Sequence, residues 1–216
     1  MVMTSSLECM LLRIIRNYKL KDLRNDANIN TERRRVEIKL ILIMILLGFL
    51  VQIAASFVLT LVLGMMPKVA ADYMSGLESL LQITPAMILR VCVIFPVLEE
   101  IFFRGIVIGI MYRFAPFAVA NVCQALVFAI YHGNIVQGVY AFLLGLFIGY
   151  VLKLTKNIVY VFVLHMSINL LGMFIDTIIP MDTPMLLKSV IAAVSFVGIA
   201  LIVKAIIRRN KVCQEC

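Results

Sequence analysis

Three ionisable side chains, Glu99, Glu100 and Arg104, lie in the middle of an apolar stretch that spans residues 95–109. Without partners they would oppose insertion of this segment into a bilayer by roughly 8–10 kcal/mol. On a helix, Glu100 and Arg104 are one turn apart and can form an ion pair. Glu99 lies about 100° around the axis and has no local partner. We therefore interpret the pair as structural and the free carboxylate as a candidate for chemistry.

Both histidines of the chain fall in or at the ends of apolar segments. His132 follows Phe128 by one helical turn, and Asn169 follows His165 by one turn on the same face. Taken singly, a buried histidine usually satisfies a helix contact, and a buried asparagine usually joins two helices. Taken together with Glu99, the two histidines and the amide can converge on one pocket.

Such a set of side chains can perform hydrolysis. A carboxylate in a low-dielectric pocket is a stronger base than one in water, so Glu99 can take a proton from a water molecule. One histidine can orient or deprotonate that water, and a second histidine with an asparagine can donate hydrogen bonds to the oxyanion of a tetrahedral intermediate. Alternatively, Glu99, His132 and His165 form a possible Zn²⁺ site with one position open for water. The sequence makes no cofactor certain.

Other peptidase chemistries lack their motifs in this sequence. It contains no HExxH, the usual helix-borne zinc motif, and no GxSxG nucleophile elbow. Beyond the N-terminal segment the aspartates are Asp72, Asp176 and Asp182, all at or near the ends of apolar segments. A buried pair of catalytic aspartates is therefore not expected.

The composition indicates that these residues lie in a membrane protein. Of 216 residues, 63% are hydrophobic and 15% are charged, whereas a soluble domain is nearer half apolar and a quarter charged. In a bilayer each apolar segment must be helical, because its backbone groups have no water to bond. We predict an all-α polytopic transmembrane helical bundle of about six spans, at roughly residues 38–64, 86–112, 115–134, 136–153, 157–178 and 186–207.

The net charge is +8, and the distribution of the basic residues along the chain fits a membrane topology better than a nucleic-acid-binding surface. Nine of the 20 Lys and Arg residues lie between residues 13 and 39, and seven more are Arg113, Lys153, Lys156 and four residues from 204 to 211. With six spans, all 16 fall on one side of the membrane, which the positive-inside rule identifies as the cytoplasm. We expect both termini in the cytoplasm, contact with the lipid bilayer and no nucleic-acid partner.

Three regions follow from this topology. Residues 1–36 form a basic, partly amphipathic cytoplasmic segment along the inner lipid surface, residues 37–210 form the transmembrane domain, and residues 211–216 form a short tail. The five scattered cysteines predict no disulfide framework. The loop at residues 67–85 has apolar residues at helical spacing and predicts a short interfacial helix. Pro96 predicts a kink in the second span.

The motifs have a familiar form when they are taken in order. Residues 99–104 read EExxxR, residues 128–132 read FxxxH, and residues 165–169 read HxxxN. On successive helices they resemble the CPBP intramembrane protease family, also called Abi, over about residues 86–178. This family includes type II CAAX prenyl endopeptidases and bacterial bacteriocin-processing or self-immunity proteins.

The resemblance implies a catalytic site and a reaction. Its residues would be Glu99 and His132 to activate water, Glu100 and Arg104 to support the site, and His165 and Asn169 on the oxyanion side. The protein would be an intramembrane endopeptidase that hydrolyses a peptide bond of a membrane-embedded peptide or protein. Family members are often labelled metalloproteases, and a metal-independent glutamate mechanism is also argued for them. The short chain resembles bacterial members, which predicts a bacterial plasma membrane.

Two other functions stay open at this point. A non-catalytic immunity or scaffold protein of the same family would carry the same motifs. A small transporter would also bury charges, but no paired, interrupted segments in two halves support it. One geometric difficulty accompanies the site: Glu99 is expected mid-span and His132 toward the outer end of its span. A tilted or short third helix would bring His132 inward.

Overall fold

The structure is a computed structural model that describes residues 36–78, 84–180 and 182–215. Apart from residue 36, the predicted basic N-terminal segment lies outside the described residues, as does Cys216 at the end of the predicted tail. Every regular element in the described part of the chain is helical. The predicted all-α architecture is therefore confirmed.

Among the described residues, four helices are long and apolar enough to cross a membrane. These are α3 (Ile38–Met65), α9 (Ile135–Thr155), α10 (Ile158–Ile178) and the Met185–Asn210 part of α11 (Met185–Glu215). Their lengths suit a hydrocarbon core about 30 Å thick. The chain is thus a multi-pass membrane protein. Because α11 continues to Glu215, most of the predicted tail is a helical extension of the last span.

The other two predicted spans are less regular, and they carry most of the candidate site. The second is a chain of consecutive helical segments over residues 85–112, and the third, α8 (Phe117–Tyr131), has only 15 residues. The consecutive segments are α5 (Pro85–Leu89), η1 (Arg90–Ile94), α6 (Phe95–Glu99), η2 (Glu100–Val107) and α7 (Ile108–Tyr112). Both η segments are π-helical, and π turns frequently occur at functional sites. Six crossings of the membrane remain a prediction.

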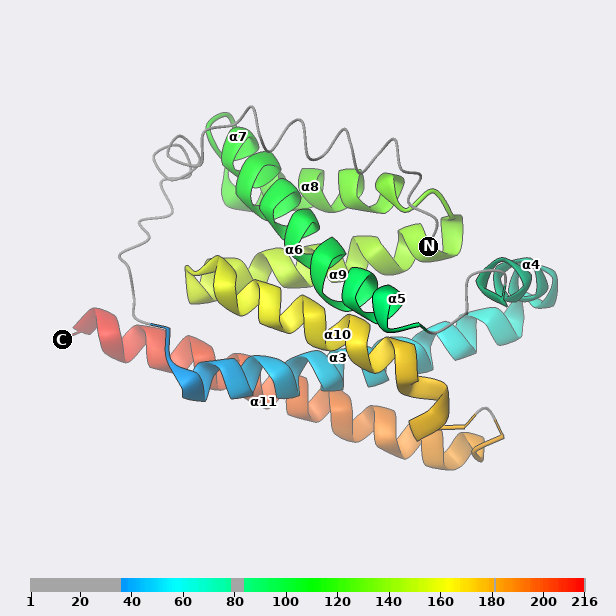
Figure 1. Ribbon diagram of the computed structural model, residues 1–216. Helices are drawn as coiled ribbons and strands as arrows, with labels where there is room; N and C mark the ends of the chain where they lie inside the picture. The colour runs from blue at the N-terminus through cyan, green and yellow to red at the C-terminus, as the bar shows by residue number, and fades with distance from the viewer. Residues whose placement is uncertain (1–35, 79–83, 181, 216) are drawn as a thin grey trace.

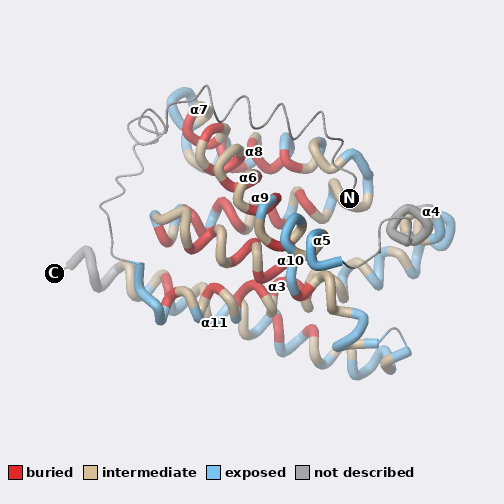
Figure 2. Tube along the Cα trace, viewed as in Figure 1, coloured by how far each residue is buried: buried red, intermediate tan, exposed pale blue. Residues whose placement is uncertain are grey.

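Figure 1 shows how the helices are layered. α3 and α11 lie together along one side, α9 and α10 occupy the middle, and α8 lies on the far side. The irregular helix of residues 85–112 runs obliquely across this bundle and contacts both α10 and α8. Buried residues concentrate where these layers meet (Figure 2), and they include Leu47 of α3 and Leu164 of α10.

Glycines bring two pairs of helices unusually close. A Cβ atom added at Gly48 of α3 would come within 2.8 Å of the carbonyl oxygen of Leu164. At Gly149 of α9 an added Cβ would come within 1.9 Å of Oδ1 of Asn121 in α8. Small residues at such points allow backbones in a membrane bundle to approach each other and to form polar contacts between helices. The α8–α9 contact matters most here, because it faces the candidate site.

Basic helix ends gather at one end of the bundle. Arg209 near the end of α11 forms an ion pair with Glu37 at the start of α3. Asn210 donates a hydrogen bond to the carbonyl of Leu154 in α9, with 2.7 Å between Nδ2 and O. This common end is the one predicted to face the cytoplasm, and its basic character agrees with the positive-inside rule. The side of the membrane that it faces remains a prediction.

Two local predictions have different outcomes. The loop after α3 forms the helix α4 (Pro67–Glu78), as its apolar spacing indicates. At Pro96 the helix continues through the proline while the segment before it widens to a π turn, and the expected kink stays a prediction. A proline removes one backbone donor, and the π turn absorbs that loss without breaking the helix.

Candidate functional site

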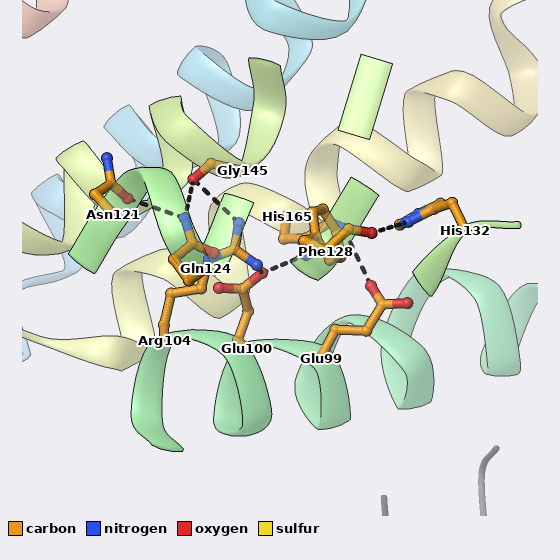
Figure 3. A network of polar contacts seen from close by, with 9 residues as sticks. All are labelled: Glu99, Glu100, Arg104, Asn121, Gln124, Phe128, His132, Gly145 and His165. Carbon is orange, nitrogen blue, oxygen red and sulfur yellow. Dashed lines mark hydrogen bonds and ion pairs between the residues drawn. The ribbon is translucent and has the colours of Figure 1, made fainter. Parts of the chain in front are cut away.

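Glu100 lies at the centre of the site and has two partners (Figure 3). Its Oε1 atom accepts a hydrogen bond from Nη1 of Arg104 at 3.0 Å, which confirms the predicted pair one turn apart. The same oxygen lies 2.6 Å from Nδ1 of His165 on α10. All three side chains are buried. Because the carboxylate accepts at this oxygen, Nδ1 of His165 carries the hydrogen and Nε2 faces away from Glu100.

Glu99 is the other buried carboxylate at the site, and one of its oxygens lies near a histidine nitrogen. Its Oε2 lies 3.7 Å from Nε2 of His165. Its Oε1 is buried and has no hydrogen-bond partner among the described residues. An unpaired carboxylate oxygen inside a protein is costly and calls for an explanation. His165 thus bridges the two glutamates, with one ring nitrogen directed toward each.

Arg104 is held from a second side by α8 and α9. Its Nη2 donates to the carbonyl of Gly145 at 3.3 Å, and its guanidinium lies 4.7 Å from the centre of the Phe128 ring. The same carbonyl accepts from Nε2 of Gln124 at 2.8 Å. That nitrogen is also 2.9 Å from Oδ1 of Asn121. The ion pair is therefore embedded in a network of polar contacts that crosses three helices.

Sequence reasoning missed Gln124 and Asn121. The signal that could have found them was a pair of amides one turn apart in an apolar segment, opposite two glycines of α9, Gly145 and Gly149. Amides in a membrane helix usually mark a polar contact with another helix. Nothing in the local sequence shows that this contact reaches Arg104, because that depends on how α8 packs against α9.

His132 lies at the C-terminal end of α8. Its Nδ1 is 2.8 Å from the carbonyl oxygen of Phe128. A carbonyl can only accept, so Nδ1 carries the hydrogen and Nε2 is left as an acceptor. The Phe128 ring lies 4.6 Å from the His132 ring and 6.1 Å from the His165 ring, measured between centres. The Phe128 ring is therefore a neighbour of both histidines, and His132 lies in the same region as Glu99 (Figure 3).

Comparison with known proteins bears directly on this geometry. Residues 81–171 match the family described as Type II CAAX prenyl endopeptidase Rce1-like. The matched segment contains all three motifs that meet in the site. Over this segment the chain is similar to the CPBP family, in agreement with the resemblance of its three motifs. At the family level this supports a CAAX-type intramembrane protease. No curated protein and no solved structure matches the chain.

The last motif residue of this CPBP-like segment makes a contact that the motif alone did not indicate. Nδ2 of Asn169 donates to the carbonyl oxygen of Val91 in η1, at 2.9 Å. This bond ties α10 to the helix that carries the glutamates. The oxyanion role that the resemblance implies for Asn169 stays a prediction, and the second N–H of Nδ2 is the one that would serve it.

The possible zinc site would take its donor atoms from Glu99, His132 and His165. Within the described ranges, no group of three or more His, Cys, Asp or Glu side chains could hold a metal ion. His165 and Glu99 approach each other, but Nδ1 of His132 is engaged on the carbonyl of Phe128 and Nδ1 of His165 on Glu100. A tetrahedral site needs its ligands at about 2 Å from one point. The arrangement does not fit the predicted three-ligand zinc set.

Proposed function

We propose that this CPBP-like chain is an intramembrane endopeptidase in which Glu99 activates the attacking water. One observation supports this most strongly: Glu99 is 1% exposed, its Oε1 has no partner among the described residues, and its Oε2 is 3.7 Å from Nε2 of His165. Glu100 also leaves one buried oxygen, Oε2, without a partner, but its Oε1 is held by both Arg104 and His165. A general base needs one oxygen available for a proton.

The reaction then proceeds in two steps. Glu99 takes a proton from water while the water oxygen bonds to the carbonyl carbon of the peptide, which places a negative charge on the carbonyl oxygen. When that intermediate collapses, the C–N bond breaks and the leaving amine takes the proton from Glu99. In its doubly protonated form, His165 donates from Nε2 to the oxyanion. In a site that excludes bulk water, such a donor is worth far more than it is in solution.

Glu100 and Arg104 support this chemistry without taking part in it. Glu100 holds Nδ1 of His165 at 2.6 Å, and this fixes the ring so that Nε2 points to Glu99. Arg104 balances the charge of Glu100 and is itself fixed on Gly145 and Phe128. A carboxylate that orients a histidine in this way is a common device at hydrolytic sites.

His132 is proposed to hold the water from the other side. Its Nδ1 is committed to Phe128, so its free Nε2 can accept a hydrogen bond from the water that Glu99 deprotonates. The substrate would be a membrane-embedded peptide or protein in a bacterial plasma membrane. The name of the matched family makes a prenylated CAAX peptide the first substrate to test.

The experiment uses the full chain reconstituted in lipid vesicles with a fluorogenic farnesylated peptide that ends in a CAAX sequence. Wild type should cleave it, and Glu99→Gln should reduce kcat by about a hundredfold or more, since general-base catalysis contributes about 10²–10⁴-fold. Glu37→Gln is the matched control, because Glu37 lies at the exposed end of the bundle in an ion pair with Arg209. Equal cleavage by wild type and Glu99→Gln would contradict the proposal.

The alternative is a non-catalytic immunity or scaffold protein of the same family. It predicts that cells carrying Glu99→Gln keep the phenotype of wild type and accumulate the same membrane peptides. A phenotype lost at normal protein abundance would count against this alternative. The position of Glu99 beside Nε2 of His165 favours the enzyme, because a scaffold has no need of a buried carboxylate next to a histidine.

A further inference from the structure

One backbone carbonyl ahead of the glutamates lacks the donor that a helix normally supplies. In η1 the N–H of Phe95 donates to the carbonyl of Arg90, five residues earlier, as in a π turn. The same register carried one residue further would pair residue 96 with Val91. Residue 96 is a proline and has no N–H. The α-helical donor to Val91 would be Phe95, whose N–H is already used by Arg90.

Asn169 supplies the missing donor from another helix. Its Nδ2 lies 2.9 Å from the carbonyl oxygen of Val91. Backbone carbonyls away from water are almost always paired, and one left without a donor disfavours its conformation by about tenfold. Pro96 is buried, so bulk water is poorly placed to supply the donor that the carbonyl of Val91 lacks.

The register of this segment decides where the glutamates point. A return from the π turn to α-helical bonding would move the following residues by one position, which is about 100° around the helix axis. A rotation of that size would carry Glu99 away from Nε2 of His165, which it now approaches at 3.7 Å. The contact between Asn169 and Val91 is therefore coupled to the geometry of the site.

We propose that Asn169 is a positioning residue that replaces the N–H absent at Pro96 and so fixes the π turn from which Glu99 is presented. This positioning role is separate from a contact with the oxyanion, because the bond to Val91 uses one of the two N–H groups of Nδ2. His165 and Asn169 then act from the same face of α10 in different ways: one faces the glutamates, and the other holds the helix that carries them. The inference rests on the proposed function only for its activity measurement.

A double-mutant cycle between Asn169→Leu and Pro96→Ala tests the proposal. Alanine restores an N–H that can donate to Val91, and a carbonyl oxygen can accept two hydrogen bonds. With proline at 96, Asn169→Leu should lower kcat by about tenfold or more, with KM unchanged, and should lower the thermal midpoint. With alanine at 96, the same substitution should lower kcat by about threefold or less. Pro96→Ala alone should keep most of the activity.

The matched control is Asn121→Leu. Asn121 also donates from Nδ2 to a helix carbonyl, that of Leu146, at 3.0 Å, but no proline lies beside that carbonyl. Pro96→Ala should not rescue Asn121→Leu. If the Asn169→Leu protein does not accumulate in cells, the cycle is repeated with Asn169→Ala. Accumulation of the Asn169 variant only when residue 96 is alanine would support the proposal.

Two results separate this inference from the proposed function. If wild type cleaves no reporter peptide, the proposed function fails, and the thermal midpoints of the purified variants still measure the coupling between residues 96 and 169. The positioning role would be overturned if Asn169→Leu lowered the thermal midpoint, and any measured kcat, by the same amount with proline and with alanine at residue 96. An unchanged midpoint with an equal loss of kcat in both backgrounds would instead assign Asn169 to the oxyanion.

Discussion

Nδ1 of His165 and Oε1 of Glu100 lie 2.6 Å apart, although the two residues are separated by 65 positions in the chain. The same carboxylate oxygen is 3.0 Å from Nη1 of Arg104. The ion pair within one helix is therefore also the support of a histidine on another helix. The glutamate that seemed purely structural in the sequence links the charge of Arg104 to the orientation of His165.

Glu100 and Arg104 should be strongly coupled in stability. Removing one member of a buried pair leaves the other charge unpaired and costs about 3–5 kcal/mol, whereas replacing both with apolar residues of similar size costs far less. We expect Glu100→Leu and Arg104→Met each to lower the thermal midpoint more than the double variant does. Thermal unfolding in detergent measures this, and additive losses would show that the pair contributes little. All three variants should lose cleavage activity, because His165 loses its support.

Gln124 should act through Arg104. Both donate to the carbonyl of Gly145, so Gln124→Leu should loosen Arg104 and lower kcat by about three- to tenfold, in line with the loss of one buried hydrogen bond. Gln52→Leu is the control: Gln52 is also a buried amide, and its Oε1 accepts from the hydroxyl of Tyr140 at 2.6 Å. An equal loss of kcat in the two variants would indicate a general effect on packing.

The contact of α8 with α9 should not tolerate a methyl group at Gly149. An added Cβ would lie 1.9 Å from Oδ1 of Asn121, so Gly149→Ala should destabilise the fold by about 1–3 kcal/mol. Gly64→Ala in α3 is the control, because nothing lies within 4 Å of its added Cβ. Thermal midpoints compare the two variants. If both variants kept the wild-type midpoint, the close approach of these helices would be wrong.

Removal of metal should leave cleavage unchanged. The described histidines and glutamates do not form a three-ligand group, so dialysis against a chelator is expected to preserve kcat for the reporter peptide. The control adds Zn²⁺ or Mg²⁺ back to the dialysed protein. A loss of activity that Zn²⁺ restores and Mg²⁺ does not would revive the zinc alternative.

Much of the architecture could be predicted because the bilayer allows few choices. Apolar length and the need to pair every backbone group predict the helices, and the bounds of α3, α9 and α10 lie within a few residues of the expected spans. The π turns around Glu99 could not be predicted in this way. On our proposal the first of them, η1, depends on the carbonyl that loses its donor at Pro96 and on an amide from a distant helix.

The chemistry of the site was predictable by residue type, and its connections were not. Spacing alone predicted the pair of Glu100 with Arg104, since residues one turn apart share a face. Spacing could not show that His165 would bridge both glutamates, nor that the Phe128 ring would neighbour both histidines. Those relations depend on how the oblique helix packs against α8 and α10.

The central claim is that Glu99 is the base of a hydrolytic site. The most direct measurement compares kcat for the farnesylated reporter peptide between wild type and Glu99→Gln, in vesicles and at equal protein abundance. The account predicts a loss of about a hundredfold or more with little change in thermal midpoint, because the amide keeps the shape of the side chain and removes the base. Cleavage by Glu99→Gln at the wild-type rate would contradict it.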